Sequence, residues 1–187
     1  MKLFESINKF REDPGSLGDY LYNEIKNISI QKKNDKEIFI YKGIYSLSGK
    51  EELFIQVSNT LKTLDSYNPL EFSQDLYILP AEKILKKNAS VEEKEKALKE
   101  KQLEDKNNFK KIKLNLANKF HKIKIFRHNM INNDIDDSII MQILTNFNYE
   151  NNTKERFFDY IFSNEIKFIG ISLSGKKAKK EGYILLA

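Results

Sequence analysis

Cysteine is absent from the 187-residue sequence, and histidine occurs only twice. Without a thiol, the chain has no disulfide framework, no thiolate nucleophile and no thiolate metal site. The two histidines, His121 and His128, would point to opposite faces of a strand, so we do not expect them to bind one metal ion together. The sequence therefore indicates no metal and no cofactor, and a chain without cysteine fits the cytoplasmic location that we expect.

Long apolar runs are missing as well. No segment approaches the roughly 20 apolar residues that a transmembrane helix needs, and residues 1–6 contain no apolar core of a secretory signal. We therefore expect no membrane insertion and no export by the general secretory route. Delivery by a specialised secretion system stays open, because it would leave no such mark.

Catalytic motifs are incomplete. No Gly-x-Ser-x-Gly sequence is present, which disfavours a serine hydrolase. Residues 170–176 spell Gly-x-x-x-x-Gly-Lys, but Lys177 stands where a phosphate-binding loop has Ser or Thr for magnesium, so we interpret them as a hairpin with a basic tip. Asp134, Asp136 and Asp137 lack the glycine and distal glutamate of a calcium loop. We interpret these acids as the favourably charged N-terminus of a helix.

The composition is that of a folded protein with a modest positive charge. Hydrophobic residues make up 40% and aromatic residues 12% of the chain, and 187 residues are enough for one domain with a sizeable core. Lys and Arg outnumber Asp and Glu by 32 to 27, which gives a formal net charge of +5. This balance favours acidic partners without requiring nucleic acid.

Residue spacing predicts an α+β fold. Apolar residues at helical intervals, with capping boxes at Ser48 and Ser90, predict helices over residues 3–11, 17–25, 48–65, 90–120, 135–147 and 154–163, a turn at 13–16 and helical turns at 81–87. Alternation predicts a hairpin around residues 33–35, strands over 44–47, 75–79, 122–126, 166–173 and 183–186, and a basic turn over 175–182. We expect one domain, residues 1–187, with a small, mostly antiparallel sheet packed with helices and one long charged helix extending from the body.

The charge pattern changes within the long helix. Acids and bases alternate over residues 91–105, whereas no acid lies between Lys106 and Arg127. The first part has too few apolar residues for a buried face, so we expect it on the surface. The second part has an apolar stripe that should dock on the body, formed by Phe109, Ile112, Leu116 and Phe120.

We expect a non-catalytic binding or assembly protein, a component of a larger complex, that acts through this helix and its basic surface. A protein partner, possibly acidic, would contact the cations Lys106, Lys110, Lys111, Lys113, Lys122, Lys124 and Arg127. A merely solvated face would show the same pattern. The first functional alternative is nucleic-acid binding, in which these cations track phosphates and Phe109, Phe120 and Phe126 stack on bases.

The second alternative is a metal-dependent nuclease. Glu165 and Lys167 stand in an acid-x-lysine pattern before an apolar run, which resembles the acid-x-lysine element of restriction-type nucleases. That chemistry needs a second acid at the same magnesium ion, and the candidates are Asp134, Asp136, Asp137 and Asp159. A charged pair on an edge strand accounts for the same two residues without catalysis.

Overall fold

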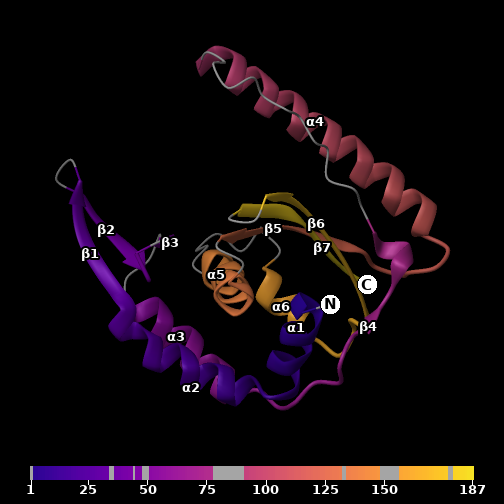
Figure 1. Cartoon of the computed structure of the whole chain (residues 1–187). Helices are drawn as coiled ribbons and strands as arrows, with labels where there is room; N and C mark the ends of the chain where they lie inside the picture. Colours follow the sequence, from indigo (N-terminus) through magenta and orange to yellow (C-terminus); the bar gives the residue numbers. More distant parts are fainter. Residues whose placement is uncertain are drawn as a thin grey trace. The chain divides into compact units, whose positions relative to one another are not determined.

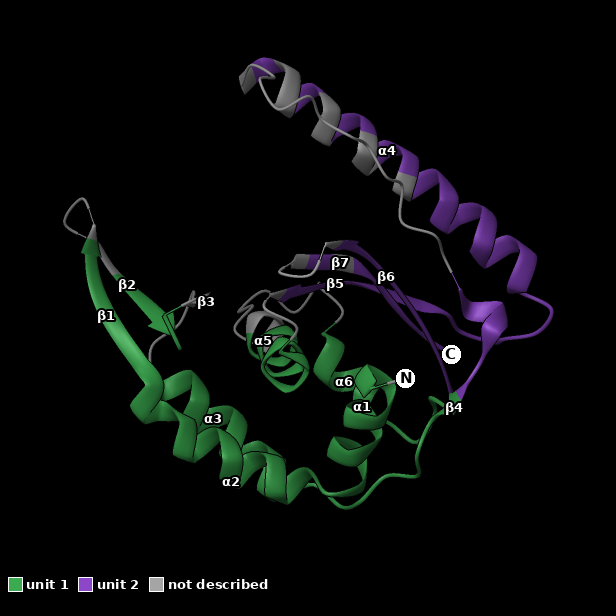
Figure 2. Cartoon of the chain, viewed as in Figure 1, with its two compact units in different colours: residues 1–71, 134–167 green, residues 72–133, 168–187 purple. Residues whose placement is uncertain are grey.

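The computed structural model describes residues 2–33, 36–43, 45–47, 51–77, 91–131, 134–147, 156–176 and 179–187. Helices combine with a three-stranded sheet of order β1-β2-β3 and a four-stranded sheet of order β4-β6-β7-β5, so the predicted α+β class is confirmed (Figure 1). The chain forms two compact units (Figure 2): unit 1 is Met1–Glu71 with Asp134–Lys167, and unit 2 is Phe72–Asn133 with Phe168–Ala187. The single domain, residues 1–187, stays a prediction.

Unit 1 is mainly helical and carries the three-stranded sheet. Helix α2 packs on α3, and α5 contacts α1, α3 and α6, so α5 lies at the centre of this unit. The elements are α1 (Lys2–Glu12), α2 (Pro14–Glu24), η1 (Ile25–Asn27), β1 (Ile28–Lys33), β2 (Lys36–Tyr41), β3 (Tyr45–Leu47), α3 (Glu51–Lys62), α5 (Ile135–Phe147) and α6 (Phe157–Ile161).

Helix α5 has the bounds that its sequence predicts, residues 135–147. Its predicted inner face, Ile139, Ile140, Ile143 and Leu144, is fully buried. At the N-terminus, the backbone N–H of Asp137 donates to Asp134 Oδ1 at 3.2 Å, which is the contact of an N-cap. Of the three acids predicted to serve this helix terminus, Asp134 is therefore the one that caps it.

The predicted turn at residues 13–16 is wrong, because α2 begins there. Asp13 is the N-cap, its Oδ1 accepts from the backbone N–H of Ser16 at 2.9 Å, and Pro14 is the first helical residue. Asp-Pro-Gly-Ser suits a turn and a helix start equally well. Further along α2, a Cβ at Gly18 would lie 2.8 Å from the carbonyl oxygen of Ser58, so glycine allows α2 and α3 to pack closely.

Unit 2 contains the larger sheet and the longest helix. Strand β7 is central and pairs antiparallel with both β5 and β6, with Ile184 opposite Phe126 on one side and Ile171 on the other. Its elements are the short β4 (Glu71–Phe72) at the border with unit 1, η2 (Gln74–Leu76), α4 (Val91–Leu116), β5 (Lys124–Ile131), β6 (Phe168–Lys176) and β7 (Lys179–Leu186).

Several boundaries in unit 2 differ from the predictions. Much of the predicted basic turn at 175–182 is strand, because β6 runs to Lys176 and β7 resumes at Lys179. A Cβ at Gly182 would lie 1.8 Å from the Ser172 carbonyl oxygen, so this glycine permits close strand approach rather than a turn. Residues 170–176 are paired along β6 and form no phosphate-binding loop.

The predicted strand at 75–79 is also wrong where it can be compared. Residues 74–76 form the short 3₁₀ helix η2, which buries Leu76 against the sheet of unit 2. Other predicted features lie outside the described residues: Ile44, the caps Ser48, Ser90 and Thr153, and the helical turns at 81–87.

Candidate functional site

The second part of α4 is fixed to unit 2 by its apolar stripe. The ring of Phe109 meets Tyr183 edge-on at 4.9 Å between centroids, and the ring of Phe120, just beyond the helix, meets Phe168 at 5.5 Å. Ile112 and Leu116 pack on the same core cluster. The predicted docking of this stripe is therefore confirmed, and it gives this part of α4 a fixed base.

The lysines of α4 lie away from that base. Lys106, Lys110, Lys111 and Lys113 are all exposed, and none has an ion-pair partner among the described residues. Lys106, Lys110 and Lys113 recur at i, i+4 and i+7, so they lie along one side of the helix. Leu103 and Leu114 are also exposed, at 61% and 75%. The exposed side of α4 thus combines lysines with two apolar side chains.

The cations of the following segment are placed differently. Lys124 pairs across the sheet with Leu186, and Arg127 pairs with Tyr183, whose ring packs on α4. Because side chains alternate along a strand, Lys124 and Arg127 point to opposite faces of the sheet. Lys122, Lys124 and Arg127 each have a polar or ring partner. The structure therefore brings the lysines of α4 together but does not gather all seven predicted cations on one surface.

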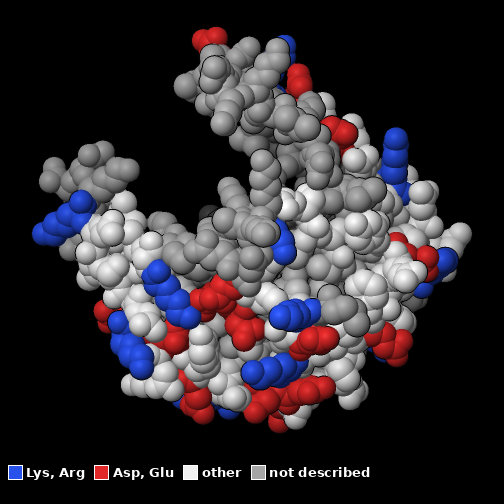
Figure 3. Space-filling view, in the orientation of Figure 1, with Lys and Arg blue, Asp and Glu red and all other residues white. Residues whose placement is uncertain are grey.

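In the first part of α4, the side chains that the structure describes between residues 92 and 107 are exposed. They alternate in charge and include Glu92, Glu95, Lys96, Lys99, Glu100 and Glu104. On unit 1, basic and acidic side chains are likewise intermixed over α2 and α3 (Figure 3), where Lys62 pairs with Asp19 at 2.7 Å. The lysines at residues 106–113 thus contrast with both of these mixed surfaces.

The nuclease candidates Glu165 and Lys167 are exposed and lie between α6 and β6. The predicted strand start at residue 166 is wrong, since β6 begins at Phe168. The proposed second acids have other roles: Asp159 pairs with Arg156 at 2.6 Å and Asp134 caps α5. Within the described residues, no group of three acids or histidines is placed to hold a metal ion.

A buried polar cluster in unit 1 was not predicted. Lys42 Nζ lies 2.8 Å from Asp137 and 3.2 Å from Glu24, while the Tyr41 hydroxyl lies 2.7 Å from Glu24 and 2.9 Å from Asp137. A hydroxyl has one proton, so Tyr41 can donate to only one carboxylate at a time. The ammonium group of Lys42 contacts both carboxylates and offsets one of their two negative charges.

The surroundings of this cluster shift its titrations. Burial lowers the pKa of Lys42, but hydrogen bonds to Asp137 and Glu24 outweigh burial and raise the pKa overall. Burial, together with hydrogen bonds to the same two carboxylates, raises the pKa of the Tyr41 hydroxyl. Both groups therefore keep their protons near neutral pH. The cluster joins the end of β2 to α2 and α5 through ion pairs and hydrogen bonds, which is a structural role.

Sequence reasoning missed the cluster because Lys42 and Asp137 lie far apart in the chain. One local signal was available: Lys42 has a φ of 50° and precedes Gly43, with a φ of 69°, in the turn that ends β2. A non-glycine residue in this left-handed region is uncommon and indicates surroundings that hold it there.

Two further findings bear on function. No helix in the described ranges is both long enough and apolar enough to cross a bilayer. No protein-family model, no curated protein and no solved structure matches this chain.

Proposed function

We propose that the chain is a non-catalytic binding or assembly protein that contacts an acidic protein partner through the exposed side of α4. The supporting observation is that one helix carries two different sides. Phe109, Ile112 and Leu116 dock it on unit 2, while the lysines at residues 106–113, with Leu103 and Leu114, remain exposed. We place this activity in the cytoplasm, as part of a larger complex.

The aromatic residues favour a protein over a nucleic acid. Stacking on bases needs exposed rings, whereas Phe109 and Phe120 are engaged with Tyr183 and Phe168, and Phe126 is only 8% exposed. The lysines can still contact phosphates, so binding to nucleic acid would be electrostatic and independent of sequence.

The free energies of leucine burial and of exposed ion pairs indicate that the leucines and the lysines contribute differently to binding. Burying an exposed leucine side chain contributes about 1.5–3 kcal/mol, whereas an exposed ion pair contributes about 0.2–1 kcal/mol. We therefore expect Leu103 and Leu114 to supply most of the affinity. The lysines would orient the partner and speed its association at low salt. An acidic amphipathic segment has the matching chemistry.

Capture from an extract of the native cell tests this proposal. The bait is the full chain, compared with the variant Lys106→Glu/Lys110→Glu/Lys113→Glu. The matched control is Lys2→Glu/Lys26→Glu/Lys32→Glu, because those three lysines are also exposed. Each Lys→Glu changes the charge by −2, so both variants go from +5 to −1.

We expect a specific protein to be captured by the wild type and the control but lost with the α4 variant. Equal capture by all three would contradict the assignment to α4. Fluorescence anisotropy with duplex and single-stranded DNA over a salt series tests the alternative. Tight DNA binding that only the α4 variant loses, without capture of a protein, would support nucleic-acid binding instead.

A further inference from the structure

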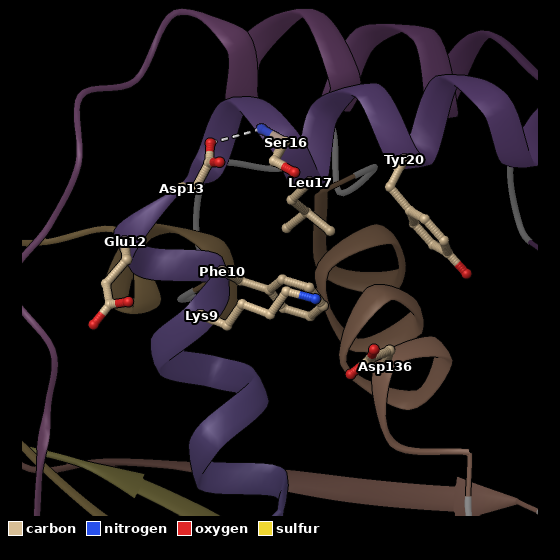
Figure 4. Close-up of a pocket in the computed structure, with 8 residues that line it drawn as sticks. All are labelled: Lys9, Phe10, Glu12, Asp13, Ser16, Leu17, Tyr20 and Asp136. Atoms are coloured by element: carbon tan, nitrogen blue, oxygen red, sulfur yellow. Dashed lines mark hydrogen bonds between the residues drawn. The ribbon is translucent and has the colours of Figure 1, made fainter.

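A pocket of about 260 Å³ lies in unit 1 between α1, α2 and α5 (Figure 4). Its volume falls just below the roughly 300–1,000 Å³ typical of sites for drug-sized ligands, so it suits a small metabolite and not a nucleotide. All residues that line the pocket belong to unit 1, whereas α4 belongs to unit 2. Any ligand here would be a second activity, held by residues other than those of the proposed partner surface.

The walls of the pocket differ in chemistry. Phe10 and Leu17 supply buried apolar surface, at 7% and 2% exposure. Lys9 on α1 and Asp136 on α5 bring opposite charges to the same space, and the ring of Tyr20 extends from α2 toward α5 (Figure 4). The lining therefore presents an apolar surface, one lysine, three carboxylates (Glu12, Asp13 and Asp136) and an aromatic ring around one small volume.

The charges of Lys9 and Asp136 have no partner in the part of the chain that the structure describes. Neither Lys9 nor Asp136 has an ion pair or a side-chain hydrogen bond with another described residue. Of the other carboxylates near the pocket, Asp137 binds Lys42 and Asp13 accepts from Ser16, while Glu12 also lines the pocket. Lys9 and Asp136 thus face one pocket without meeting each other.

We infer that this pocket binds a small zwitterion, namely a free α-amino acid with an apolar side chain. The ammonium group would pair with Asp136 beside the Tyr20 ring, which attracts cations. The carboxylate would pair with Lys9, and the side chain would cover Phe10 and Leu17. A simple anion would meet Asp136 and a simple cation would meet Lys9, so only a ligand with both charges satisfies both walls.

Titration of the full chain with L-leucine, L-methionine and L-phenylalanine, followed by amide NMR shifts, tests the inference. N-acetyl-L-leucine lacks the ammonium group and L-leucinamide lacks the carboxylate, so they serve as matched probes. We expect saturable shifts in α1, α2 and α5 with at least one amino acid, and at least tenfold weaker binding of both leucine derivatives. No saturable shift with any of the three at about 10 mM, above the micromolar to millimolar range usual for small metabolites, would overturn it.

Charge-removing variants separate the two walls. Asp136→Asn should weaken amino-acid binding at least tenfold and abolish the preference over N-acetyl-L-leucine. Lys9→Gln should weaken it equally but abolish the preference over L-leucinamide. The control Lys2→Gln changes an exposed lysine of α1 outside the pocket and should bind as the wild type does. Unchanged binding in Asp136→Asn and Lys9→Gln would place the ligand elsewhere and overturn the inference.

Discussion

Lys42 holds two carboxylates together in unit 1, and replacing it with methionine tests what that cluster contributes to stability. The side chain of Asp137 is only 3% exposed. Removing one partner of a buried ion pair costs about 3–5 kcal/mol, because the other charge stays buried and uncompensated. Lys42 is itself 30% exposed, so water screens part of the interaction. We expect Lys42→Met to lower the free energy of unfolding by about 2 kcal/mol at pH 7.

This loss of stability should shrink as the pH falls, and the direction of that change follows from the pKa of Glu24. Burial raises the pKa of Glu24, but hydrogen bonds from Tyr41, Asn27 and Lys42 and the charge of Lys42 outweigh it, so its pKa is lowered overall. A carboxylate with a lowered folded pKa contributes full stability above its unfolded pKa of about 4.3. It loses that contribution as the pH falls through its folded pKa. Below about pH 4 the wild type therefore loses more of its free energy of unfolding than Lys42→Met does, and the difference between the two proteins shrinks.

Urea unfolding followed by far-UV circular dichroism measures both effects, since the chain has no tryptophan to report by fluorescence. Lys26→Met is the matched control, because Lys26 is an exposed lysine of the same unit. The double variant Lys42→Met/Asp137→Asn should recover part of the loss, since one of the two carboxylates left without a cation is gone. A loss under about 0.5 kcal/mol, the size of an ordinary surface change, or an equal loss at pH 7 and pH 3, would refute the reasoning.

Three further predictions follow from packing and charge. Gly182→Ala should destabilise unit 2 by about 1–3 kcal/mol, because the new Cβ would lie 1.8 Å from the Ser172 carbonyl oxygen. In the same urea assay, Gly15→Ala should be neutral or stabilising, because its new Cβ would lie 3.6 Å from the nearest atom, Asp13 Oδ1. Arg11→Lys should cost about 2–4 kcal/mol by urea unfolding, because the buried guanidinium donates to the carbonyls of Asn68, Ile161 and Ser163 and a lysine cannot reproduce that fork; an unchanged midpoint would contradict this. Deleting residues 92–105 should leave the circular dichroism of the remaining chain and its urea midpoint intact while abolishing partner capture, and loss of folding would show that this part of α4 is needed for the core.

The sequence predicted best the elements whose signals are local. Helix α5 has its predicted bounds because Ile139, Ile140, Ile143 and Leu144 mark one face and acids mark its start. The hairpin of β1 and β2 and the docking stripe of α4 follow from spacing in the same way. The predicted turn at residues 13–16 was wrong because the same side chains suit a turn and an N-cap, and only the packing of α2 decides between the two.

Features that depend on distant contacts were beyond the sequence. Gly182 was interpreted as part of a turn, whereas its role depends on the approach of Ser172 in a neighbouring strand. Lys42 and Asp137 meet across 95 residues of chain, so neither carries a local signal of its partner. For the candidate surface, the lysines of α4 followed from helical spacing, but the opposite faces of Lys124 and Arg127 became clear only with the register of β5 against β7.

Site-specific photo-crosslinking at Leu114 tests the proposed partner contact most directly, because this side chain is 75% exposed beside the lysines of α4. A photoreactive phenylalanine analogue at this position, irradiated in an extract of the native cell, should form an adduct that protease removes and nuclease does not. The adduct should disappear in Lys106→Glu/Lys110→Glu/Lys113→Glu and should not form with the analogue at Lys26 on unit 1. An adduct that nuclease removes, or one formed equally at Lys26, would contradict a protein-binding surface on α4.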